Sequence, residues 1–267
     1  MRLRRIAALI LRQFYLMRGS PARVVPLFAW VGIDIILWGF LTRYLNTVSS
    51  ASFDFVPALL GAVLLWDFLV RVLQGITTAF LEEVWSRNFM NLFASPLSIG
   101  EYVIGMVLTS LMTSSVGLVF MLVIASVMFG LSFLSYGLLL IPFLVVLLLF
   151  GVALGIFGTG IVLRFGPAAE WFIWPLPALI SPFAGVLYPV STLPVWMQYI
   201  ARMLPPSYVF EGMRAIVLGH PVNRTGLLYG VILAMVFVAL AYLWFASIYR
   251  YAVRQGLIAR YSAESVS

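Results

Sequence analysis

The stretch LEEVWSRNFMNLFASPLS, residues 81–98, is a polar segment between two long apolar runs. Trp85, Phe89, Leu92 and Phe93 recur at the spacing of one helical face, and charged or polar residues fill much of the remainder. The pattern predicts an amphipathic helix beside a membrane, which either docks on a soluble partner or lies among lipid headgroups. The candidate partner-binding residues are Glu82, Glu83, Trp85, Arg87, Phe89, Leu92 and Phe93, with the two glutamates expected at a solvated edge.

Composition assigns the chain to the membrane. Hydrophobic residues make up 63% of its 267 residues and charged residues only 9%, with a mean hydropathy of +1.09. No soluble domain of this length has such a composition. The net charge of +7 comes from arginine alone, and the arginines flank apolar runs instead of forming a surface for nucleic acid.

Several classes of chemistry are excluded by residues that the chain lacks. Without cysteine there is neither a disulfide framework nor a thiolate metal site. His220 is the single histidine, so HExxH sites and histidine-clustered metal sites are absent. Because the chain has no lysine, it cannot contain a P-loop, whose lysine reaches the terminal phosphates of ATP. We therefore expect no catalytic residue, metal or cofactor, and any ATP must be hydrolysed by another polypeptide.

The apolar runs predict an all-α membrane protein with six transmembrane helices in a single domain, residues 1–267. Each run is long enough to cross a hydrocarbon core of about 30 Å. The fifth run contains Pro175, Pro177, Pro182 and Pro189, so we expect a broken or re-entrant helix there. The six runs cover residues 24–42, 56–80, 102–129, 137–163, 171–190 and 227–249.

Two further segments are predicted to lie at the membrane surfaces. Residues 1–22 predict an amphipathic interfacial helix, whose arginines we expect to face anionic headgroups. Residues 191–220 predict two short helices that dip into the outer leaflet as a re-entrant segment. Ser98 and Glu101 have the spacing of a capping box at the start of the third span.

Arginine asymmetry predicts the orientation. Twelve of the 16 arginines fall on the side that holds both termini and residues 81–98. Because arginine-rich loops stay in the cytoplasm, we expect both termini and the polar segment to be cytoplasmic.

Three charged residues fall inside the predicted spans. Asp34 lies in the first span, and Asp67 and Arg71 lie four residues apart on one face of the second. They form either a polar element of a translocation path or a structural ion pair that joins two helices. In the fourth span, Gly151-x-x-x-Gly155 is typical of close helix packing.

Two segments of the sequence resemble permease subunits of ABC transporters of the type-2 export family. LEEVWSRNFMNLFASPLSIGEYVIGMVL, residues 81–108, is similar to the family's cytoplasmic loop and third span, and GVLYPVSTLPVWMQYIARMLPPSYVFEGMRAIVLG, residues 185–219, to its outer re-entrant region. The matching positions are Glu82, Glu83, Ser95, Pro96, Leu97, Ser98 and Gly105, then Gly185, Pro189, Val190, Ser191, Leu193, Pro194, Trp196, Pro205, Tyr208, Glu211 and Arg214.

The resemblance implies half of a transmembrane unit in a bacterial cell membrane. Two copies, or one copy and a homologous permease, would pair among membrane lipids and bind two copies of an ABC ATPase subunit. Residues 81–98 would be the coupling region, with a coupling helix over 81–94. The segment LMRGSPARVVPLF lacks the basic signature of polysaccharide exporters, which argues against glycan export. The expected substrate is lipophilic or amphipathic, and export of a drug or a lipid competes with export of a lipid-linked glycan.

A different class of function stays open at this point. An ATP-independent secondary transporter could use Asp34, Asp67 and Arg71 to move its substrate, and a membrane scaffold would transport nothing.

Overall fold

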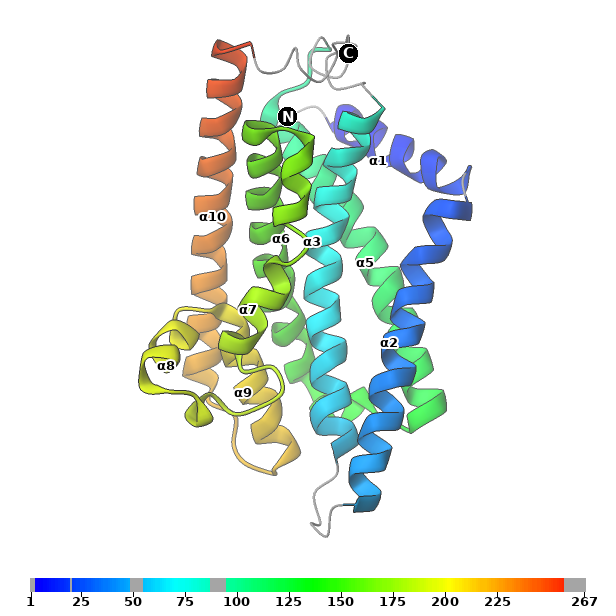
Figure 1. Cartoon of the computed structure of the whole chain (residues 1–267), viewed down its shortest axis with the longest axis vertical. Coiled ribbons are helices and arrows are strands. Elements are labelled where there is room, and N and C mark those ends of the chain that lie inside the picture. The colour runs from blue at the N-terminus through cyan, green and yellow to red at the C-terminus, as the bar shows by residue number, and fades with distance from the viewer. Residues whose placement is uncertain (1–2, 20, 49–54, 87–94, 257–267) are drawn as a thin grey trace.

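The computed structural model describes residues 3–19, 21–48, 55–86 and 95–256, and every regular element in these ranges is helical. Figure 1 shows long helices side by side, with short helices gathered at one end. The elements are α1 (Leu3–Arg18), α2 (Pro21–Val48), η1 (Val56–Leu60), α3 (Gly61–Trp85), α5 (Ile99–Phe129), η2 (Phe133–Leu139), α6 (Leu140–Phe165), η3 (Pro167–Phe172), α7 (Leu176–Ala184), η4 (Val190–Thr192), α8 (Val195–Arg202), α9 (Pro205–Val217) and α10 (Arg224–Arg254).

Five segments of the described chain are long and apolar enough to cross a membrane, where six were expected. They are Phe28–Val48, Val56–Trp85, Ile99–Phe129, Tyr136–Phe165 and Arg224–Arg254. The expected fifth run, residues 171–190, contains no continuous helix of that length. Pro175 stands at the start of α7, which has only nine residues and ends at Gly185 in the left-handed conformation (φ 64°). Proline breaks the regular hydrogen bonding in this run, as its sequence predicts.

The broken run still connects the two ends of the bundle. In Figure 1, α1 and the C-terminal end of α10 lie at one end, and α8 and α9 lie at the other. The chain therefore passes from one end to the other between α6 and α8, through η3 and α7.

Helix α3 lies at the centre of the bundle, packed between α5 and α6, while α10 packs on the far side of α6. Leu64, Leu69, Val72 and Ile76 are fully buried along α3. The hydroxyl of Ser110 on α5 donates to the carbonyl oxygen of Val72 at 2.8 Å. This buried hydrogen bond fixes the register of α3 and α5, because no water is available as an alternative acceptor for the Ser110 hydroxyl.

The two glycines of the fourth run are in contact with α3. A Cβ atom on Gly151 would lie 2.8 Å from the carbonyl oxygen of Leu69, and one on Gly155 would lie 2.8 Å from the Cβ of Ile76. Only a residue without a side chain allows the backbones of α3 and α6 to approach so closely. The expected close packing at these glycines is therefore present.

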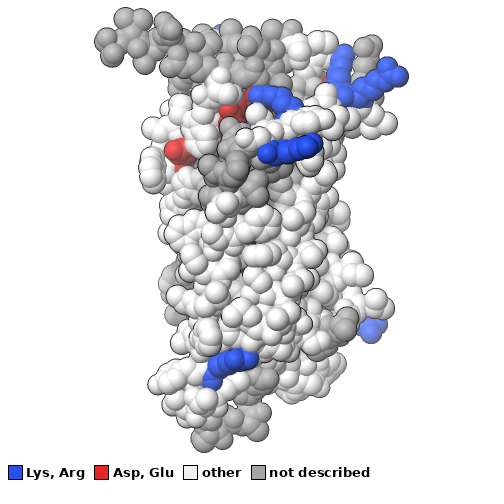
Figure 2. All heavy atoms as spheres, turned by 90° about the vertical axis from the view of Figure 1, so that its right-hand side faces the viewer, with Lys and Arg blue, Asp and Glu red and all other residues white. Residues whose placement is uncertain are grey.

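The outer surface of the bundle is apolar between two polar ends. Figure 2 shows charged side chains toward the top and bottom of one face, with a broad uncharged band between them. Large apolar side chains are exposed along α5 at helical spacing, including Met112, Val116, Val119, Val123 and Val127. Such a band suits contact with lipid tails or with another apolar helix.

Candidate functional site: the polar end of the bundle and the charges inside it

The polar segment is described up to Ser86 and again from Ser95. Four of the candidate partner-binding residues, Arg87, Phe89, Leu92 and Phe93, lie outside the described residues, and the helix expected over them stays a prediction. Of the remaining three, Trp85 ends α3 and is 56% exposed, whereas Glu82 is half-buried and Glu83 is buried.

Glu83 is held by the N-terminal helix. Its carboxylate forms an ion pair with Arg12 of α1, and the neighbouring Glu82 accepts a hydrogen bond from Gln13. Glu83 is only 5% exposed, so the expectation of a solvated edge is wrong for this residue. A buried carboxylate requires a partner, and α1 lies close enough to supply one.

The N-terminal helix also holds the other flank of the polar segment. Arg5 donates to the carbonyl oxygen of Pro96 and lies 3.3 Å from the carboxylate of Glu101, which is 4% exposed. The expected capping box is formed, because the Glu101 amide donates to the Ser98 hydroxyl at 3.3 Å and the Ser98 amide donates to the Glu101 carboxylate at 3.0 Å. Glu101 thus stabilises the start of α5 and binds α1 at the same time.

Helix α1 turns two of its arginines toward protein. Arg5 and Arg12 are seven residues apart on one helical face, beside Ile6, which is 4% exposed, and Leu9, which packs against Gly105 of α5. The opposite face exposes apolar side chains: Leu3, Leu11, Phe14 and Tyr15. The expectation that these arginines face lipid headgroups is therefore wrong for Arg5 and Arg12, because they pair with the carboxylates of Glu101 and Glu83 instead.

Sequence reasoning missed this brace between α1 and both flanks of the polar segment. We use the name brace for the contacts of Arg5, Arg12 and Gln13 with Glu82, Glu83, Pro96 and Glu101. The available signal was the seven-residue spacing of Arg5 and Arg12, which places both on one face next to apolar residues.

The three charged residues of the first two spans lie on neighbouring helices. Asp34 is exposed on α2, while Asp67 and Arg71 are half-buried on α3. The charge of Asp67 interacts electrostatically with those of Asp34 and Arg71, and the Oδ2 atom of Asp67 is buried without a hydrogen-bond partner. The guanidinium of Arg71 packs against α5, where a Cβ atom on Gly117 would lie 2.6 Å from its Nη1 atom. Both interpretations of these charges, a polar element of a translocation path and a structural ion pair, stay predictions.

Replacing Asp67 with asparagine separates the two interpretations of these charges. Because the Oδ2 atom of Asp67 is buried without a hydrogen-bond partner, we expect Asp67→Asn to keep or raise the unfolding temperature of the purified protein. We expect the same variant to reduce transport if the carboxylate faces the substrate path. A clear loss of thermal stability in this variant would show that Asp67 has a structural role.

At the opposite end, one carboxylate joins α9 to the preceding loop. Glu211 accepts from the amide of Val190 at 2.8 Å and from Arg214 at 2.9 Å, and Arg214 in turn donates to the carbonyl oxygen of Val186 at 3.3 Å. Partial burial raises the pKa of the Tyr208 hydroxyl, which donates to the carbonyl oxygen of Arg202 at 2.7 Å. These contacts position the short helices α8 and α9 against the end of the bundle.

The sequence and the helical architecture together identify the family. Residues 4–218 match the family described as ABC-2 type transporter. The match covers most of the chain, from the brace helix α1 to the end of α9. The chain therefore belongs to the ABC-2 type transporter family, whose members are membrane components of transport systems.

Curated relatives with a local match come from Rhizobium. Nodulation protein J of Rhizobium leguminosarum bv. trifolii is 37% identical over 65 residues, which is 23% of this chain and 25% of that protein. Nodulation protein J of Rhizobium meliloti (strain 1021) is 34% identical over 70 residues, which is 25% of this chain and 27% of that protein. The matched segment spans about a quarter of the length of these relatives.

Proposed function

We propose that this chain is the membrane subunit of an ATP-driven exporter. It moves a lipophilic or amphipathic substrate out of the cytoplasm or the inner leaflet, and a separate ABC ATPase supplies the energy. The observation that carries this proposal is the match to the ABC-2 type transporter family over residues 4–218. The absence of lysine supports the division of labour, because a chain without a P-loop cannot hydrolyse the ATP itself.

The same proposal includes six crossings of a bacterial cell membrane with both termini in the cytoplasm. The fifth crossing in chain order, residues 171–190, is the discontinuous one, through η3 and α7. Two observations support this topology: α1 and the end of α10 lie at the same end of the bundle, and most arginines fall on that side (Figure 1). Helices α8 and α9 then form the outer re-entrant segment within residues 191–220.

The ATPase docks on the coupling region, residues 81–98, with one ATPase subunit on each of two paired permeases. Trp85 supports this placement, because a large aromatic side chain is exposed there at the end of the buried helix α3. The brace holds both flanks of this docking site, residues 82–83 and 96–101, against α1. A movement of the docked ATPase would be transmitted from the coupling region directly to α3 and α5, and to α2 through the contacts of α1.

Purification in a mild detergent tests the proposal. We expect a P-loop ATPase to copurify with the wild-type chain and to hydrolyse ATP, and we expect Phe89→Asp to lose that subunit while the permease still inserts in the membrane. The matched control is Tyr199→Asp, which places the same carboxylate on a 62% exposed aromatic of α8, at the other end of the bundle. This control should keep the ATPase.

A different result would move the assignment to another class of protein. If the wild-type chain purifies alone, with no ATPase and with transport that follows pH or membrane potential, it is a secondary transporter that uses Asp34, Asp67 and Arg71. If Phe89→Asp and the wild type retain the ATPase equally, the coupling region is not the docking site. Glu83→Arg is a poor test of docking, because Glu83 is buried against Arg12.

A further inference from the structure

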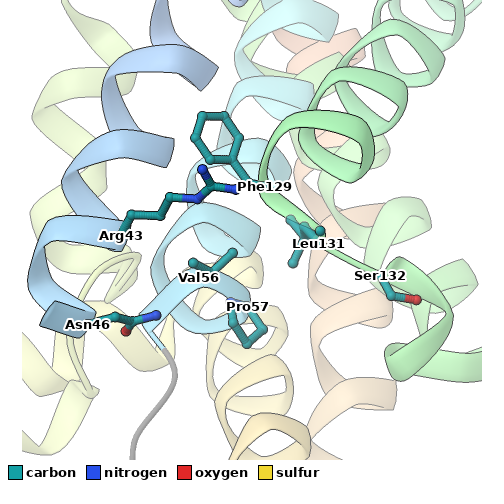
Figure 3. Close-up of a pocket in the computed structure, with 8 residues that line it drawn as sticks. Arg43, Asn46, Val56, Pro57, Phe129, Leu131 and Ser132 are labelled. Atoms are coloured by element: carbon teal, nitrogen blue, oxygen red, sulfur yellow. The ribbon is translucent and has the colours of Figure 1, made fainter.

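A cavity opens at the end of the bundle opposite α1, between the C-terminal end of α2, η1 and the C-terminal end of α5. Its volume is about 430 Å³, which is within the range of small-molecule sites. Figure 3 shows Arg43 reaching from α2 across the cavity toward Phe129, with Asn46 one turn further along α2. The lining residues are Arg43, Asn46, Val56, Pro57, Phe129, Gly130, Leu131 and Ser132.

Arg43 carries a positive charge into this cavity. One of its five N–H groups donates to the carbonyl oxygen of Met128 at 2.6 Å, and its guanidinium carbon lies 5.1 Å from the centre of the Phe129 ring. These two contacts hold the planar group in place. In the part of the chain that the structure describes, no carboxylate lies within ion-pair distance of Arg43. Among the described residues this fixed guanidinium has no carboxylate partner, and a guanidinium in that state is well suited to bind an anion.

The walls of the cavity indicate the chemistry of its ligand. Val56 and Leu131 are apolar residues of the lining, and 8% and 2% of their surfaces are exposed. Asn46 is fixed on the wall because its side-chain oxygen accepts the amide of Phe55 at 2.8 Å. A free phosphate ion would use only the charged part of such a site. A phosphate or carboxylate attached to an apolar group would use both parts.

We propose that this cavity binds the anionic headgroup of an amphiphile, with the anion on Arg43 and the apolar portion against Val56, Pro57 and Leu131. The competing explanation is that Arg43 only completes the end of α5, where backbone carbonyls favour a cation. That role accounts for the contact with Met128. It does not account for the cavity beside the guanidinium or for the mixture of polar and apolar walls. The site does not depend on the proposed ATPase partnership.

A titration of the purified full chain in a non-ionic detergent tests this inference. The probes are dihexanoyl phosphatidylglycerol, dihexanoyl phosphatidylcholine and inorganic phosphate. We expect the phosphatidylglycerol to bind, and we expect Arg43→Gln to weaken that binding by about tenfold or more, since a charge-assisted hydrogen bond is lost. Arg202→Gln is the matched control, because Arg202 stacks on Tyr199 at the same end of the bundle and does not line the cavity.

Two further measurements locate the site and identify the source of the anion. Ser132→Trp fills the cavity while Arg43 keeps its contacts, so it should also abolish binding. Binding of inorganic phosphate as tight as that of the lipid would identify a free anion as the occupant, with Arg43 still its ligand. The inference is overturned if phosphatidylglycerol binds Arg43→Gln or Ser132→Trp as tightly as it binds the wild type, or if it binds no variant at all. Unchanged unfolding temperatures for both variants would show that lost binding is not lost folding.

Discussion

Replacing Arg12 with glutamate should cause a large loss of stability and uncouple the transporter from its ATPase. The substitution leaves the buried carboxylate of Glu83 opposite a like charge. Breaking a buried ion pair costs about 3–5 kcal/mol, and we expect about 2–3 kcal/mol here because Arg12 keeps 34% of its side-chain surface in solvent. The measurements are the unfolding temperature of the purified chain and the ATPase activity that copurifies with it.

Reversing both charges tests whether the ion pair between Arg12 and Glu83 causes this loss of stability. Arg12→Glu combined with Glu83→Arg restores opposite charges in the brace, so the double variant should recover most of the stability lost in either single variant. Arg18→Glu is the control, because Arg18 is exposed at the end of the same helix. If Arg12→Glu and Arg18→Glu have equal effects, the brace contributes nothing beyond the general charge of α1.

A valine at position 151 should prevent α3 and α6 from packing. The added side chain would meet the carbonyl oxygen of Leu69 at 2.8 Å and the Cβ of Val72 at 2.9 Å, measured from the first carbon alone. Neither group can move aside, because α3 is enclosed by α5 and α6. We expect Gly151→Val to lower the free energy of unfolding by about 3 kcal/mol or to abolish expression of folded protein.

Gly32→Val provides a matched comparison in another spanning helix. A Cβ atom on Gly32 would have no heavy atom within 4 Å, so the same substitution should be tolerated there. The yield of folded protein and its unfolding temperature in detergent are the measurements. Equal losses for both variants would mean that valine harms these helices in general and that the contact of Gly151 with α3 is not special.

Local sequence signals predicted the fold well. The four prolines of residues 171–190 predicted a broken helix there, because each proline lacks the N–H that a helix interior requires. The Ser98 and Glu101 spacing predicted the capping box, and the spacing of Gly151 and Gly155 predicted close packing. Each of these features depends on residues within one turn or one helix, where sequence distance and spatial distance agree.

The brace could not be predicted in the same way. Arg12 and Glu83 are 71 residues apart, and Arg5 and Glu101 are 96 residues apart. Their pairing depends on how α1 lies across α3 and α5, which helical periodicity does not determine. For the same reason, the spacing of Asp67 and Arg71 placed both on one face of α3 without deciding whether their side chains meet. In the structure their charges interact electrostatically, and the Oδ2 atom of Asp67 has no hydrogen-bond partner.

The brace has a consequence for the order in which the chain assembles during synthesis. Arg5 and Arg12 leave the ribosome well before Glu83 and Glu101, because the N-terminal end is made first. During that interval their only available counter-charges are anionic lipids, to which a basic amphipathic helix binds. Once α3 and α5 have inserted, we expect the two arginines to leave the lipid phosphates and pair with Glu83 and Glu101. We therefore expect α1 to dock late in biogenesis, at a rate that depends on the charge of the surrounding leaflet.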